Sequence, residues 1–130
     1  MTHSPIPEDV RRFVLTSVPS VPFLEALLLL RADPGQRWDA PMLARRLYTR
    51  ERVAHDLLGA LRDADMARRC ESPFDDCYSY APGSAALRAM IDALAELYAR
   101  QLVEVTHLIH SSLERKAQQF ADAFRLRKDA

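Results

Sequence analysis

The sequence predicts a mainly α-helical protein in which a helix–turn–helix is followed by a small β-hairpin and a long C-terminal helix. Three observations support this fold class. Apolar residues recur three and four positions apart through most of the chain, which is the spacing of one face of an α-helix. Residues 66–81 instead contain two short segments on either side of a cluster of turn residues. Residues 84–130 contain neither proline nor glycine, so nothing in them predicts the end of a helix.

Length and charge fit one folded domain with an extension. The chain has 130 residues, of which 48% are hydrophobic, and its 18 basic side chains balance 18 acidic ones. This balance gives no support to a nucleic-acid partner, so any case for one depends on where the charges lie along the chain. Residues 45–52 hold four arginines and one glutamate, whereas residues 71–76 hold three acidic side chains and no basic one. Without a signal segment or a long apolar run, we expect a cytoplasmic protein that contacts no membrane.

Capping residues divide the N-terminal half into short helices. Residues 8–18 form an amphipathic segment. Ser20 is a good cap for a helix over residues 22–31, which is apolar on nearly every side and therefore belongs deep in the core. Asp39 is a good cap for the next helix, over residues 40–47.

A short break separates that helix from another, over residues 51–64. We expect Trp38 and Tyr48, which flank the helix before the break, to seal the core. The apolar residues of the helix after the break are spaced three and four apart and predict one inward stripe: Val53, Ala54, Leu57, Leu58 and Leu61.

Residues 66–70 and 77–81 flank the turn sequence SPFDD and predict a β-hairpin. A turn centred within that sequence places Cys70 opposite Cys77, at a cross-strand separation of about 5 Å. Two interpretations follow. The pair is a reversible thiol switch, or it is two small side chains packed beneath the hairpin, which is the interpretation we favour.

The helical pattern of residues 84–126 begins at Ser84, a plausible cap, and Phe120 and Phe124 continue its apolar stripe. A helix of that length would measure about 60 Å at ~1.5 Å per residue, whereas a compact domain of this size is only about 30 Å across. The stripe must contact a second chain, or the helix must break and fold back. We favour a homodimer, since two-fold pairs are the commonest oligomers. The predicted interface residues are Leu87, Ile91, Leu94, Leu97, Tyr98, Val105, Leu108 and Ile109.

Three short motifs mark the helix–turn–helix and its exit into the hairpin: Leu-Ala-Arg-Arg-Leu at 43–47, Leu-Leu at 57–58 with Leu61, and Ala-Asp-Met-Ala-Arg at 64–68. In this order and spacing they resemble the winged helix-turn-helix of bacterial transcriptional regulators, over residues 22–81. The long flanking helix is similar in architecture to MarR-like regulators. The resemblance implies a winged domain over residues 1–83 and a dimerisation helix over residues 84–130.

The chain departs from the family pattern at three positions. Tyr48 stands at a turn position that is often glycine. Arg50 replaces the usual Ser or Thr cap of the second helix, so either Thr49 caps one residue early or nothing does. Asp65 replaces the glycine before the wing, although Asp tolerates a left-handed backbone better than most residues.

In this family the second helix of the motif enters the major groove of double-stranded DNA. The resemblance implies that Arg52 and His55 contact base edges. It implies phosphate contacts for five further arginines: Arg45, Arg46, Arg50, Arg68 and Arg69.

Acidic residues complicate this interpretation. Asp56 lies four residues after Arg52, so it either aims that arginine or neutralises it. Asp75 and Asp76 place negative charge at the wing tip, where phosphate would repel it. The competing hypothesis is therefore a winged-helix module that binds a protein partner through the long C-terminal helix.

Other chemistry has weaker support. Tyr78, Tyr80 or Tyr98 could line a pocket for a small-molecule effector, but we favour core packing for them. His107 and His110 are three residues apart with Glu104 and Glu114 on neighbouring turns, yet we expect solvent-facing histidines. The chain shows no catalytic triad spacing and no glycine-rich phosphate loop. We predict no enzyme activity, no cofactor and no metal site.

Overall fold

The structure, a computed structural model, describes residues 5–71 and 76–129. The helices in this part of the chain are α1 (Glu8–Ser17), α2 (Val21–Ala32), α3 (Ala40–Leu47), α4 (Glu51–Asp63), α5 (Ala85–Arg100) and α6 (Leu102–Asp129), and the strands are β1 (Ala67–Arg69) and β2 (Tyr78–Tyr80). The predicted fold class is confirmed, because the chain is mainly helical with a small antiparallel hairpin and a long C-terminal helix.

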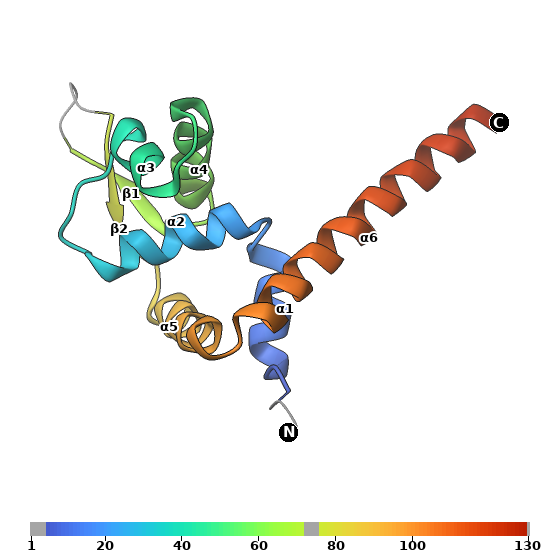
Figure 1. The fold of residues 1–130 in the computed structure, drawn as a ribbon, viewed down its shortest axis with the longest axis horizontal. Coiled ribbons are helices and arrows are strands. Elements are labelled where there is room, and N and C mark those ends of the chain that lie inside the picture. Colours follow the sequence, from blue (N-terminus) through green and yellow to red (C-terminus); the bar gives the residue numbers. More distant parts are fainter. Residues whose placement is uncertain (1–4, 72–75, 130) are drawn as a thin grey trace.

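The helices form two groups, and the C-terminal part of α6 extends away from both (Figure 1). In one group α2 packs against α3, α4 and β2, and in the other α1 packs against α5 and α6. Within the described residues, no single helix combines the length and the apolar composition needed to cross a bilayer. The helices α1 and α2 meet both conditions only as a pair that is bent by 108°.

Three helices begin where the sequence predicts a capping side chain. At each start a side-chain oxygen accepts a hydrogen bond from the backbone N–H three residues later, which satisfies one of the unpaired donors of a helix N-terminus. The pairs are Ser20 with Phe23 (3.2 Å), Asp39 with Met42 (2.9 Å) and Ser84 with Leu87 (3.0 Å).

Helix α2 lies deep in the core, as its uniformly apolar sequence predicts. Its buried side chains are Phe23, Leu24, Ala26, Leu27 and Leu30. Trp38, which follows α2, is also buried as expected. Tyr48 does not seal the core, which corrects the prediction: its side chain is 96% exposed at the C-cap of α3. Val53 is 39% exposed, so the inward stripe of α4 begins only at Ala54.

The prediction of one unbroken C-terminal helix is wrong. The chain leaves helical geometry at Gln101, with φ −131° and ψ 54°, and α5 and α6 both pack on α1. Folding back lets the apolar faces of α5, α6 and α1 cover one another within one chain. Most of the predicted interface residues are consequently buried in the core of a single subunit, which corrects their assignment: Ile91, Leu94, Leu97, Val105, Leu108 and Ile109. Leu87 and Tyr98 pack against that core and are partly buried.

Beyond the buried Ser112, α6 has apolar residues that the rest of the chain does not cover. Leu113 is 40% exposed, Phe120 74% and Phe124 62%. Figure 1 shows this part of the helix projecting from the body of the molecule. The apolar stripe that the sequence predicts is therefore divided, with its first part in the core and its last part at the surface.

The hairpin gains a third backbone segment that the sequence did not predict. Strands β1 and β2 pair antiparallel with Ala67 opposite Tyr80. Trp38 pairs with Tyr78 on the other side of β2 through two backbone hydrogen bonds of 2.7 and 2.8 Å. This bridge ties the hairpin to the segment that leads into α3. The predicted turn positions Pro73 and Phe74, and with them Asp75, lie outside the described residues.

The exit from α4 depends on a close backbone contact. Asp65 adopts the left-handed conformation, with φ 63°, that its place in the resemblance anticipates. Its carbonyl oxygen accepts a hydrogen bond of 2.9 Å from the N–H of Gly83. A Cβ atom at Gly83 would overlap the Asp65 carboxylate, so any other residue there would require the Asp65 side chain to move.

Tyr80 has a buried hydroxyl for which the described residues provide no hydrogen-bond partner. Burial raises the pKa of the Tyr80 phenol above its usual value, and the Asp92 carboxylate adds to the effect. The folded state therefore favours the neutral phenol. The stability that this contributes is complete below about pH 10, the pKa of an unfolded tyrosine, and is lost as the pH rises towards the higher folded value.

We expect Tyr80→Phe to leave the free energy of unfolding at neutral pH unchanged or to raise it by about 1 kcal/mol, because it removes an unsatisfied buried group. Above about pH 10 the variant should lose less stability than the wild type. Denaturant unfolding at both pH values measures these effects, with the exposed Tyr48→Phe as a control. A large loss of stability at neutral pH would contradict the conclusion that the buried Tyr80 hydroxyl has no hydrogen-bond partner.

Candidate nucleic-acid interface

The turn between α3 and α4 exposes the start of the second helix of the motif. Arg50 is the N-cap residue of α4, and no side chain caps the helix there, which settles the alternative left open for Thr49. The Thr49 N–H instead donates to the Ala44 carbonyl at the end of α3, at 3.0 Å. The first turn of α4 is thus presented to solvent.

All seven residues that the resemblance assigns to DNA contact are exposed: Arg45, Arg46, Arg50, Arg52, His55, Arg68 and Arg69. They come from α3, the turn, α4 and β1. Arg46 lies over the ring of Trp38, with 5.8 Å between the guanidinium carbon and the ring centre. Within the described part of the chain, Arg45, Arg50, Arg52 and Arg68 form no ion pair. Their charges are therefore available to an external anion.

The Asp76 side chain lies between the hairpin and α4. One of its carboxylate oxygens lies 3.7 Å from His55 Nδ1 on α4, and the other lies 3.6 Å from Arg69 Nη2 on β1. All three side chains are more than half exposed, so each contact is worth only about 0–1 kcal/mol. The acidic residue that seemed to oppose DNA binding thus faces two basic side chains, and a phosphate group would have to compete with it for them.

Arg52 and Asp56, both among the described residues, form no ion pair with each other. The predicted pairing four residues apart is therefore absent. Both side chains are exposed on α4. Asp56 neither aims nor directly neutralises Arg52 in this structure, and it is a negative charge on the outward side of the helix with no ion pair to any described residue.

Gly59 is a residue whose role the sequence analysis missed. Positions 52, 56, 59 and 63 are four, three and four residues apart and share the face of α4 opposite its buried side chains. A Cβ atom at Gly59 would meet nothing closer than the Arg62 guanidinium, at 4.0 Å. The packing of the protein does not require glycine here, although glycine costs about 1 kcal/mol relative to alanine inside a helix.

Tyr48 stands out by its backbone and its exposure. It has a left-handed backbone, with φ 55° and ψ 45°, and an almost fully exposed ring directly before α4. A residue with a side chain in this conformation costs about 1–2 kcal/mol relative to glycine. Among the described residues, neither burial nor a side-chain contact accounts for tyrosine at this turn, and its departure from the family pattern is visible in the sequence.

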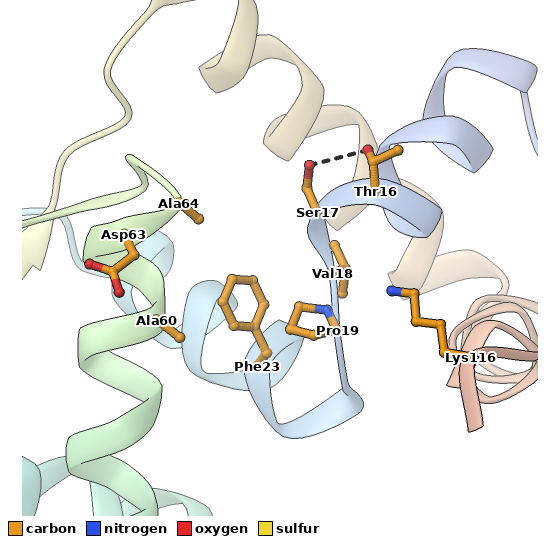
Figure 2. Close-up of a pocket in the computed structure, with 9 residues that line it drawn as sticks. All are labelled: Thr16, Ser17, Val18, Pro19, Phe23, Ala60, Asp63, Ala64 and Lys116. Carbon is orange, nitrogen blue, oxygen red and sulfur yellow. Dashed lines mark hydrogen bonds between the residues drawn. The ribbon is translucent and has the colours of Figure 1, made fainter. Parts of the chain in front are cut away.

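A groove of about 460 Å³ lies where the two groups of helices meet (Figure 2). The ends of α1 and α4, the start of α2 and Lys116 of α6 contribute to it, and the Lys116 side chain points towards the groove. Its lining residues are Thr16, Ser17, Val18, Pro19, Phe23, Ala60, Asp63, Ala64 and Lys116. The three tyrosines proposed for an effector pocket do not line it.

His107 and His110 are both exposed on α6. Among the described residues, no group of three or more His, Cys, Asp or Glu side chains is placed to hold a metal ion. The exposed basic residues around α4 and β1 are therefore the main candidate site.

Comparison with known proteins supports the fold and leaves the function open. No protein family and no curated protein matches the chain. Among solved structures, the chain is similar to the crystal structure of RV1404 from Mycobacterium tuberculosis, with 13% sequence identity and a TM-score of 0.51. The similarity covers 88% of this chain and 82% of that chain. At this identity the likeness concerns the fold alone.

We expect Gly59→Ala to raise the free energy of unfolding by about 0.5–1 kcal/mol, because it removes the helix penalty of glycine without creating a close contact. Denaturant unfolding measures the change. Ala89→Gly, at an exposed position of α5, is the matched control and should lower stability by a similar amount. A destabilised Gly59→Ala variant would mean that the fold itself needs glycine at this position.

Proposed function

We propose that this protein is a winged helix-turn-helix transcriptional regulator that binds double-stranded DNA as a homodimer. One observation carries the proposal. The seven basic residues implied by the resemblance are all exposed, on elements that pack together, and five of the six arginines form no ion pair among the described residues. Such a surface attracts phosphate even though the chain has no net charge.

In this proposal α4 enters the major groove. Arg52 and His55 contact base edges, and the exposed Val53 is suited to an apolar contact with a thymine methyl group. Gly59 lets the helix approach the groove closely, which gives a reason for glycine where the fold needs none. Arg45, Arg46, Arg50, Arg68 and Arg69 hold phosphates.

The proposed dimer interface now lies on the outer part of α6. Leu113, Phe120 and Phe124 are seven and four residues apart, so they share one helix face. Exposed phenylalanine is costly in water, and a second copy of α6 would bury it. This interface replaces the residues predicted from the sequence, which are largely occupied in the core of one subunit.

A small-molecule effector is part of the same proposal. The groove in Figure 2 lies between α4, which would read DNA, and α6, which would set the distance between subunits. An occupant of this groove would bias the angle between the two helices. The lining of the groove carries one positive charge, on Lys116, and one negative charge, on Asp63, so charge alone selects neither an anionic nor a cationic compound.

The alternative function is a winged-helix module that binds a protein partner through α6 instead of DNA. The same exposed face of α6 favours it, and so do Asp56 and Asp63, whose negative charges lie on the outward face of α4. The two functions differ in whether the protein binds duplex DNA and in whether it is a dimer on its own.

We expect the protein to bind random duplex DNA at low salt and to lose affinity by about 10³–10⁵-fold between 50 and 200 mM salt, which is the loss for six to ten phosphate contacts. Fluorescence anisotropy across a salt series measures this dependence. Arg52→Glu and Arg46→Glu should each weaken binding by at least about tenfold.

Arg12→Glu provides the matched control, since it makes the same charge change at an exposed position of α1, outside the proposed surface. Absence of binding at low salt would remove the DNA-binding proposal and favour the alternative. Equal losses of DNA affinity for Arg52→Glu and Arg12→Glu would show that DNA is attracted by the overall charge of the protein and that α4 has no special role.

We also expect Phe120→Glu to convert the dimer into a monomer, because a charge would have to be buried in the proposed interface. Sedimentation velocity measures the change. Gln118→Glu, which adds the same charge on the opposite side of α6, should leave the dimer intact. A wild-type protein that is already monomeric would exclude the homodimer and leave α6 for a different partner.

A further inference from the structure

We propose that Cys70 and Cys77 form a reversible redox site that controls how strongly the protein binds DNA. The disulfide holds Asp76 against Arg69 and His55, and reduction frees both basic side chains for phosphate. This inference rests on the proposed function. It adds a means of regulating DNA binding through the oxidation state of the two cysteines.

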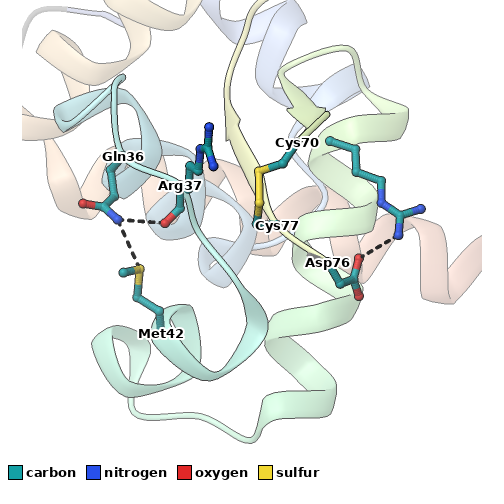
Figure 3. Close-up of a disulfide and its surroundings, with 7 residues drawn as sticks. Gln36, Arg37, Met42, Cys70, Asp76 and Cys77 are labelled. Carbon is teal, nitrogen blue, oxygen red and sulfur yellow. Dashed lines mark hydrogen bonds and ion pairs between the residues drawn. A yellow bond between two sulfur atoms is a disulfide. The ribbon is translucent and has the colours of Figure 1, made fainter. Parts of the chain in front are cut away.

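The hairpin places the two cysteines directly opposite each other. Arg69 pairs with Tyr78 at the end of the β-ladder, so Cys70 and Cys77 are the next cross-strand pair. Their Cα atoms are 5.3 Å apart, and a disulfide joins them (Figure 3). The Cys70 N–H also donates to the Cys77 carbonyl at 2.8 Å. Since this backbone contact holds the cysteines together, the S–S bond can form or break without rearranging β1 and β2.

Asp76 is the residue most directly governed by this bond. It is the covalent neighbour of Cys77 and lies inside the ring that the disulfide closes. Among the described residues, the hydrogen bond between Cys70 and Cys77 is the outermost backbone bond of the hairpin, so no backbone pairing holds residue 76 itself. Its position beside Arg69 and His55 therefore depends on the cross-link, on a weak, exposed ion pair with Arg69 and on a contact with His55 that is an ion pair only when the imidazole is protonated.

The proposed compartment makes the bond reversible. A DNA-binding regulator works where glutathione and thioredoxin-like proteins keep thiols reduced, and disulfides found there are usually catalytic or redox-sensing. Cys70 is only partly buried, whereas Cys77 is buried. Cys70 is thus the sulfur that an incoming thiolate or peroxide reaches first.

Each direction of the reaction is balanced. In reduction, a dithiol reductant attacks Cys70 Sγ and releases Cys77 as a thiolate, which takes up a proton; the second thiol then releases Cys70. Two electrons and two protons reach the protein, and the reductant becomes a disulfide. In oxidation, the Cys70 thiolate attacks hydrogen peroxide to give a sulfenic acid and hydroxide, which takes up a proton to become water. The Cys77 thiol then attacks the sulfenic sulfur to form the S–S bond, and its proton leaves with the displaced hydroxide as a second water.

The direction of regulation follows from charge. In the oxidised hairpin, Asp76 opposes two of the seven basic residues on the reading surface. In the reduced hairpin, both are free to contact phosphate. The reduced protein should therefore bind duplex DNA about tenfold more tightly, with a salt dependence steeper by about one counterion per subunit.

The experiment measures the affinity of the full chain for random duplex DNA at fixed salt, after treatment with excess dithiothreitol or with hydrogen peroxide. The mass of the intact protein confirms the thiol state. The double variant Cys70→Ser, Cys77→Ser should bind like the reduced protein under both treatments. Asp76→Asn should still form the disulfide but should bind tightly in both states.

Glu71→Gln is the matched control. It removes a second exposed carboxylate from the same disulfide ring, but Glu71 forms no ion pair with Arg69 or His55. This variant should keep the full redox response. Equal affinity of the oxidised and reduced wild type, tighter binding by the oxidised form, or a redox response that persists in Asp76→Asn would each overturn the inference.

A readout without DNA separates this inference from the proposed function. The NMR signals of the His55 imidazole should shift when the wild type is reduced and should not shift when Asp76→Asn is reduced. If neither redox form binds DNA, the proposed function fails, and this signal still shows whether the disulfide holds Asp76 in place. An unchanged signal in the wild type would refute the coupling directly.

Discussion

The burial of α2 on nearly every side is the constraint on which the arrangement of the exposed basic residues on α3, α4 and β1 depends. A helix with leucines all around it must be covered from several directions, and α3, α4 and β2 supply that cover. The elements that carry the basic residues are thus positioned by what they bury, not by contacts among the basic residues themselves. Because the exposed ion pairs are weak, the apolar contacts around α2 fix the separation between α4 and the hairpin.

Local features of the fold could be predicted from the sequence, and long-range ones could not. Caps such as Ser20 and Asp39 act within one turn of their own helix, so residue type and spacing suffice to find them. The break at Gln101 carries no proline or glycine signal, because it arises from packing on α1. The bridge between Trp38 and Tyr78 joins segments forty residues apart in the chain, and no local pattern encodes it.

The candidate site follows the same division. Exposure of the arginines could be predicted, since charged side chains rarely lie in a core. The surroundings of Asp76 could not, because they depend on how the hairpin lies against α4. Tyr48 and Val53 were misplaced because both stand at the edge of a helical stripe, where periodicity no longer distinguishes inside from outside. The position of Cys70 opposite Cys77 could be predicted, because a hairpin fixes its own cross-strand pairs. The favoured interpretation of two packed, unlinked side chains is wrong, since a disulfide joins them.

A small tilt at the base of the projecting part of α6 would move its far end by a much larger distance. From Ser112 to Arg125 it spans thirteen steps of the chain, or roughly 20 Å at ~1.5 Å per residue. A tilt of about 10° at its base would move its far end by roughly 3.4 Å, which is the rise of one base step in a DNA strand. In the proposed dimer, a small change of packing where α6 leaves the body would therefore change the distance between the two DNA-binding subunits. The change would be about one base step, so the subunits would no longer match the spacing of the two halves of a binding site.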